Sequence, residues 1–149
     1  MTTIIISAVA GIAAWFATNF LGRPILDLRE CRLNALKIAE RYSGVSLASS
    51  AGLRGTALTA YVDAGNAFLA YSREGSIAVR LWCRVFGYDL EIAALCLFGL
   101  ADGPRGHSVS NETRRNTLNA LHVSLGAAHH LSRADLTKVR KLISEHKAH

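Results

Sequence analysis

Charged residues are absent from the first 22 positions of this chain, although seventeen Lys and Arg and eleven Asp and Glu follow them. Proline is also scarce, with two residues in 149, and no low-complexity segment is present, which argues against a disordered protein. The three cysteines are odd in number and irregularly spaced, which excludes a secreted scaffold built on disulfides. The length of 149 residues is typical of one domain, and because half of the residues are hydrophobic, they can form a modest core.

The uncharged segment predicts a transmembrane helix over residues 1–22. As a helix, residues 3–21 would extend about 28 Å, close to the ~30 Å hydrocarbon thickness of a bilayer. A cleaved signal peptide is one alternative, but no basic residue precedes the apolar run and no cleavage signal follows it. A buried core helix is the other, and it would be an unusually long helix without a charged face.

Basic residues are concentrated on the C-terminal side of this segment, because Arg23, Arg29 and Arg32 follow it closely. The positive-inside rule then places the N-terminus outside the cell and the remaining chain in the cytoplasm. We expect these three arginines to contact lipid headgroups, since anionic lipids attract basic residues next to a membrane span.

The rest of the chain predicts an all-α fold, because no segment alternates apolar and polar residues as a strand does. A juxtamembrane amphipathic helix is expected over residues 23–44, either leaving the membrane directly or bending along its surface. A cytosolic helical bundle is expected over residues 56–149. Residues 46–55 and 101–109 have the Ser, Gly and Pro content of loops.

Several helix starts can be assigned from capping residues. Ser76 is expected to cap a helix that ends at Gly87, and its apolar content predicts a place at the centre of the core. Asp89 is expected to cap a short helix buried inside the bundle. Ser110 or Asn111, and later Ser132 with Asp135, resemble the starts of the last two helices.

The predicted membrane helix has one face made of small residues. This face predicts self-association, because small residues let helix backbones approach closely and a neighbouring amide can hydrogen-bond between helices. Its members are Ser7, Gly11, Ala14 and Thr18, with Asn19 beside them.

Catalytic motifs are few. Arg115 and His122 fit the loose Arg-x4-6-His pattern of HEPN ribonucleases, a resemblance that implies His122 as general base and Arg115 as phosphate ligand. His129 and His130 point about 100° apart on a helix and have no carboxylate or Cys to complete a metal site. We therefore expect no metal, no cofactor and no enzymatic activity.

The net charge of +6 indicates an anionic partner. Lipid at the cytoplasmic leaflet is one such partner, and nucleic acid, bound through its phosphates, is the alternative.

The end of the apolar run also resembles a group of uncharacterised small bacterial single-pass inner-membrane proteins. The resemblance rests on Gly22-Arg23-Pro24 followed by Leu28-Arg29, and on the stretch at residues 97–102 that precedes Arg114-Arg115. It implies a location in the bacterial inner membrane and no particular activity.

Together these features predict a membrane-anchored, self-associating helical protein. By analogy of architecture, such a protein is a candidate membrane-perturbing or pore-type effector of bacterial antiviral defence. The alternatives are a membrane-tethered HEPN-like ribonuclease or nucleic-acid binder, and a membrane adaptor or scaffold that holds a protein partner.

Overall fold

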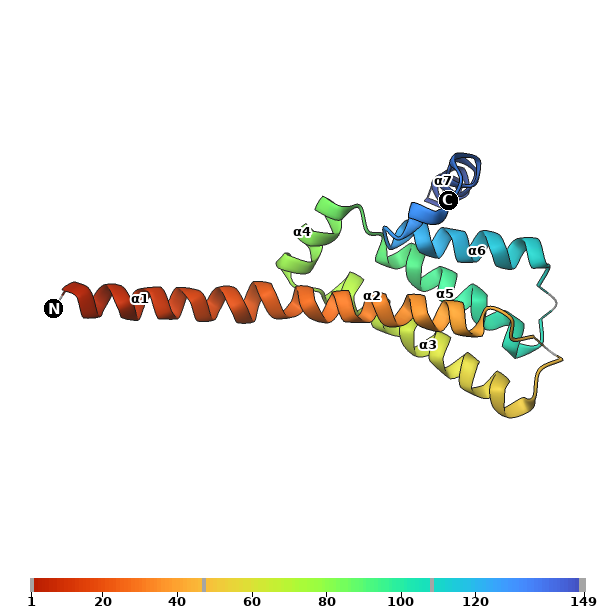
Figure 1. Ribbon diagram of the computed structural model, residues 1–149, viewed down its shortest axis with the longest axis horizontal. Helices are drawn as coiled ribbons and strands as arrows, with labels where there is room; N and C mark the ends of the chain where they lie inside the picture. Colours follow the sequence, from red (N-terminus) through yellow and green to blue (C-terminus); the bar gives the residue numbers. More distant parts are fainter. Residues whose placement is uncertain (1, 47, 108, 148–149) are drawn as a thin grey trace.

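The computed structural model describes residues 2–46, 48–107 and 109–147, and every regular element among them is helical. The all-α prediction is therefore confirmed for this part of the chain. The N-terminal part of the chain is one continuous helix made of α1 (Thr2–Phe16), a π-helical segment η1 (Ala17–Gly22) and α2 (Arg23–Tyr42). Figure 1 shows that α1 projects away from the other helices, whereas α2 runs along the bundle.

At Gly22 and Pro24 the helix changes type but does not break. Gly22 keeps right-handed helical angles (φ −69°, ψ −54°), and the N–H of Arg23 bonds to the carbonyl of Thr18. Proline has no N–H, and its ring crowds the carbonyl four residues earlier, so a wider π-helical turn before Pro24 accommodates it. The helix thus continues straight from the apolar segment into the bundle, along the first of the two paths left open for it.

The remaining helices are α3 (Ala51–Glu74), α4 (Ile77–Phe86), α5 (Leu90–Arg105), α6 (Asn111–Ser124) and α7 (Arg133–Lys147), with a 3-10 turn η2 (Ala128–His130) before α7. The main packing interfaces join α3 to α5, α5 to α6, and α2 to α3. Among the described residues, no single helix combines the length and the apolarity that crossing a membrane requires.

The core is built around a close approach of α3 and α5. Small residues such as Ala57 and Ala93 are fully buried, and a Cβ added at Gly65 would lie 2.6 Å from the Phe98 ring. Tyr61 and Phe68 fill the space beside these small residues. The interface therefore combines small residues with large aromatic ones in one buried core.

The α2 helix packs into this core. Leu28, Ala35, Ala39 and Tyr42 are buried among the core residues. The guanidinium of Arg114 on α6 donates to the carbonyls of Ser43 and Val45 at 3.0 Å each, and so satisfies the C-terminal end of α2.

Both predicted loops are shorter than expected. The helix α3 begins at Ala51 instead of residue 56, because Ser50 caps it by accepting the N–H of Leu53. The helix α5 continues to Arg105 because Gly103 and Pro104 are buried against the bundle, and it ends at Gly106, where φ is +98°. Burial thus stabilises a turn whose sequence is typical of a loop.

The predicted caps of the other helices are confirmed. Ser76, Asp89, Ser110 and Ser132 each accept a backbone N–H from the residue three positions later. The burial predicted for α5 is confirmed as well, since most of its apolar residues lie in the core.

The prediction that α4 lies at the centre of the core is wrong. Ile77, Leu81 and Val85 are 84%, 58% and 69% exposed, and Phe86 is half exposed. Only one side of α4, with Ala78 and Val79, is buried. The helix lies at the edge of the bundle where α1 projects, so it covers the core from outside.

Candidate functional site

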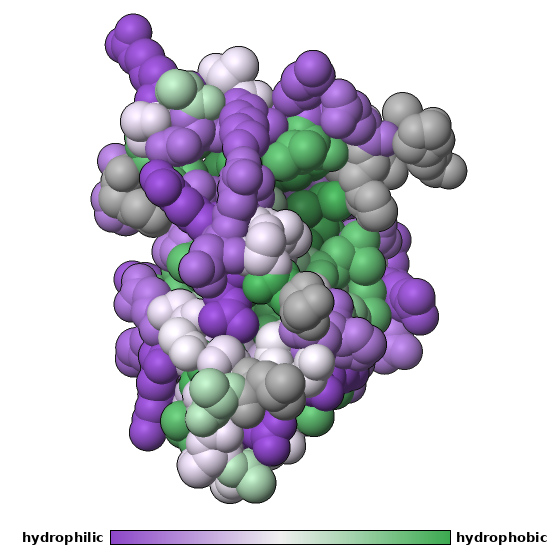
Figure 2. Space-filling view, turned by 90° about the vertical axis from the view of Figure 1, so that its right-hand side faces the viewer, coloured by the Kyte–Doolittle hydropathy of each residue, from purple (hydrophilic) through white to green (hydrophobic). Residues whose placement is uncertain are grey.

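Apolar side chains are most exposed at the end of the molecule from which α1 projects. Trp15, Phe16 and Phe20 form an exposed aromatic cluster, with ring centroids 5.2 Å apart for Trp15–Phe16 and 5.1 Å apart for Phe16–Phe20. Ile12 and Leu21 are exposed on the same segment. The opposite end differs, since Figure 2 shows a largely hydrophilic surface there with a hydrophobic hollow.

The small-residue face of α1 and η1 is exposed along its described length. Ser7, Gly11, Ala14 and Thr18 are all exposed, and an added Cβ at Gly11 would meet no atom within 4 Å. The Thr18 hydroxyl donates to the Ala14 carbonyl at 2.9 Å. The face is therefore open to another helix, while its Thr18 hydroxyl is satisfied inside its own helix.

Asn19 differs from the other members because it is half-buried. Its Nδ2 donates to the Trp15 carbonyl at 2.9 Å. An amide that bonds its own helix has less need of a partner helix, since part of its cost in an apolar medium is already offset. Asn19 therefore has less need of a partner helix than the sequence suggests.

Two of the three arginines expected at lipid headgroups are exposed, namely Arg23 and Arg29. Arg32 is placed differently. Its Nε donates to the Leu125 carbonyl at 2.6 Å, and its guanidinium lies 5.2 Å from the centre of the Tyr88 ring. Arg32 therefore holds α2 against the end of α6, and this contact makes it a poor headgroup ligand.

Arg115 and His122 both lie on α6, but they are exposed to different degrees. Arg115 is exposed at the surface, whereas His122 is 6% exposed. A general base must reach the proton that it removes from the substrate. His122 is buried, and this geometry disfavours the ribonuclease alternative.

The cysteines are not activated. Burial raises the pKa of the Cys96 thiol to about 12, and burial also raises the pKa values of Cys31 and Cys83. Such thiols stay protonated near neutral pH and are weak nucleophiles. Within residues 2–46, 48–107 and 109–147, no three His, Cys, Asp or Glu residues are grouped so that they could hold a metal.

The exposed face of α4 was missed by the sequence reasoning. Ile77, Leu81 and Val85 recur at every fourth position, and Arg80 and Arg84 lie between them. Apolar residues on every side of this short helix except that of Arg80 and Arg84 are the signal that could have identified it, since one neighbouring core covers only one side.

Comparison of the chain with protein families, with characterised proteins and with solved structures finds no match to any of them. The resemblance to small inner-membrane proteins therefore stays a prediction. The function must be argued from the exposed surfaces of the chain itself.

Proposed function

We propose that this protein is a membrane-anchored, self-associating helical protein of the bacterial inner membrane, with its N-terminus outside and its bundle in the cytoplasm. The observation that carries the proposal is the uncharged rod of residues 2–22, which has exposed apolar side chains at Ile12, Trp15 and Phe20 and continues into the bundle without a break. In water, an exposed apolar surface of this size would favour aggregation, whereas lipid would cover it.

The length of the rod supports this proposal. The 15 residues of α1 alone fall short of a bilayer, but η1 extends the uncharged helix by six residues. Together they reach about 30 Å, which matches the hydrocarbon thickness. The hydrogen bonds of Thr18 and Asn19 to their own helix also lower the cost of placing these polar groups in lipid.

Orientation is proposed from charge. The basic residues nearest to the rod, Arg23 and Arg29, are exposed on its C-terminal side. We therefore expect them to remain on the cytoplasmic side, next to anionic headgroups.

Self-association through the small-residue face is proposed to assemble several spans. We propose that the membrane-perturbing activity, which is the effector role expected by analogy, also depends on this assembly of spans. Gly11→Leu tests both, because a larger side chain at this open position fills the face without disturbing the fold of the single chain. Ala13→Leu is the matched control, since Ala13 is also exposed but points away from that face.

We expect Gly11→Leu to lower the mass of the complex in mild detergent toward that of the monomer and to reduce dye leakage from vesicles. Ala13→Leu should change neither. An unchanged mass for Gly11→Leu would contradict self-association through this face. If the wild-type protein assembles but causes no dye leakage, that result would contradict the membrane-perturbing activity and leave self-association standing.

A further inference from the structure

The exposed apolar side of α4 is continuous with its buried side. On a helical wheel, Ile77, Leu81 and Val85 lie next to the arc of Ala78 and Trp82. The apolar arc is thus wider than the part that the bundle covers. The rings of Trp82 and Phe86 contact each other in a tilted arrangement, with centroids 4.3 Å apart, and continue this arc.

Basic residues border the exposed side of the same helix. Arg80 and Arg84 are exposed and occupy the remaining arc, next to Ile77 and Leu81, and α4 contains no acidic residue. An apolar arc bordered by arginine is typical of helices that lie in the interface of a membrane with anionic lipids.

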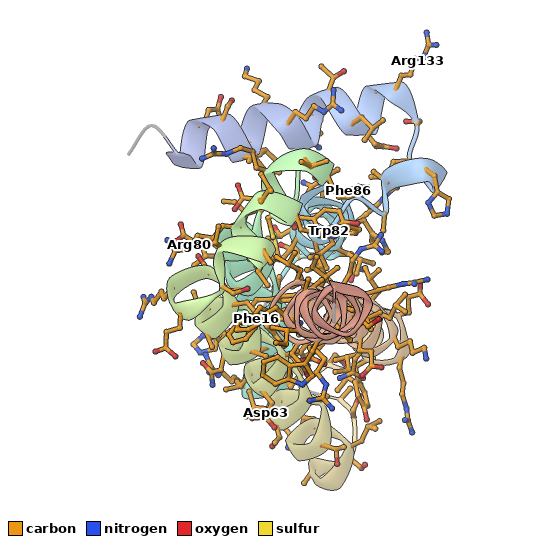
Figure 3. The ribbon with its side chains drawn as sticks, turned by 90° about the vertical axis from the view of Figure 1, so that its left-hand side faces the viewer. Phe16, Asp63, Arg80, Trp82, Phe86 and Arg133 are labelled. Carbon is orange, nitrogen blue, oxygen red and sulfur yellow. The ribbon has the colours of Figure 1, made fainter. Side chains whose placement is uncertain are left out.

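The position of α4 in the fold agrees with this composition. It contacts η1 and α2, which meet where the uncharged segment ends. Figure 1 shows that α4 crosses the direction of α1 at the edge of the bundle, and Figure 3 shows it beside the base of that helix, with Arg80 directed outward. A bilayer spanned by residues 2–22 would therefore have its cytoplasmic surface close to α4.

We propose that α4 is a second membrane contact, which lies in the interface of the cytoplasmic leaflet with Ile77, Leu81 and Val85 in the lipid and Arg80 and Arg84 at anionic headgroups. This inference rests on the proposed membrane anchor. It assigns α4 the task of fixing the bundle against the membrane surface at a second place.

Lipid fits this surface better than a second copy of the chain does. A stable protein interface buries about 800 Å² on each partner, far more than three adjacent aliphatic side chains supply. Two copies joined through α4 would also bring their arginines together without an acidic residue of α4 to pair with them. Anionic lipid satisfies both the apolar arc and the charge.

The native tryptophans provide the test, because the chain has two and they report on different places. In full-length W15F, Trp82 reports on α4, and in W82F, Trp15 reports on the anchor. The triple variant W15F/W82F/L53W places a control reporter in the exposed first turn of α3. Each protein is reconstituted into phosphatidylcholine–phosphatidylglycerol vesicles whose acyl chains carry bromine either near the headgroups or near the bilayer centre.

We expect Trp82 fluorescence to be quenched at least about twofold more by shallow bromine than by deep bromine, because an interfacial helix enters lipid by only ~5–10 Å. Trp15 should also be quenched, and the L53W reporter should not. Quenching of Trp15 without quenching of Trp82 would overturn the α4 contact and leave the anchor standing. Quenching of neither would overturn both proposals, and equal quenching of Trp82 and the L53W reporter would overturn a specific contact.

A second variant separates lipid from a protein occupant. In W15F, the triple change I77S/L81S/V85S alters exposed side chains only and should abolish the shallow quenching of Trp82, whereas L53S should not. The mass of the complex in detergent should be the same for both. A fall in mass with the α4 variant would instead identify this face as an interface between copies and overturn the proposal.

Discussion

The helices α4 and α5 follow one another in the chain, and both are rich in apolar residues, yet only α5 is buried. Leu97, Ala93 and Ala101 of α5 are fully buried between α3 and α6, whereas Leu81 and Val85 of α4 are mostly exposed. The difference arises from what surrounds each helix. Neighbouring helices enclose α5, while α4 contacts the bundle along one side.

This comparison shows that apolar content alone does not identify a core helix. The two helices should respond differently when a large apolar side chain is truncated. The truncation removes buried packing contacts in α5, whereas in α4 it removes a side chain that is mostly in contact with solvent. The segment of residues 12–21 belongs with α4 in this respect, since its large apolar side chains are also exposed in the single chain.

The largest contrast is expected from truncating one leucine in each helix. Leu97→Ala should lower the free energy of unfolding by about 2–5 kcal/mol, because it leaves a cavity in a fully buried site. Leu81→Ala should change it by less than about 0.5 kcal/mol. Denaturant titration in detergent, followed by circular dichroism, measures both. Equal losses would mean that α4 is also a core helix.

A smaller effect is expected from the close approach of α5 to α3. Gly65→Ala should destabilise the fold by about 1–3 kcal/mol, because the new methyl group overlaps the Phe98 ring. Gly55→Ala on the same helix should stabilise it by about 0.5–1 kcal/mol, since that position faces open space. The same titration applies, and a neutral Gly65→Ala would show that α5 lies farther from α3.

The smallest effect concerns the cysteines of the two helices. Cys83 on α4 is half-buried and Cys96 on α5 is buried, so a maleimide should modify Cys83 first in the folded protein. Burial raises the pKa of Cys96 to about 12, above the ordinary value of 9.0, so the folded state retains this proton longer than the unfolded chain. Its contribution to stability is complete below about pH 9 and is lost as the pH rises toward 12. Mass spectrometry of the labelled peptides checks the order, and faster labelling of Cys96 would contradict it.

Local signals were sufficient for much of the fold. The caps at Ser76, Asp89, Ser110 and Ser132 lie where a polar side chain precedes an apolar run, and this depends on neighbouring residues only. Periodicity likewise indicates which residues of a helix are apolar. It does not indicate what covers them, so the exposed side of α4 could not be predicted.

Contacts between distant parts of the chain account for the other differences. Arg32 was expected at the membrane, but it bonds to Leu125, 93 positions later. The burial of His122 likewise depends on how α6 packs against other helices. The sequence spacing between Arg115 and His122 gives no information about that packing. Of the candidate site, the sequence indicated the uncharged rod and its small face, whereas the role of α4 required the structure.

Extraction of membranes from cells that express the full-length protein tests the central claim most directly. An anchor formed by residues 2–22 predicts that the protein stays in the membrane pellet after washes with high salt and alkaline carbonate, and that only detergent releases it. Recovery of the full-length protein in the soluble fraction, without detergent, would contradict the account.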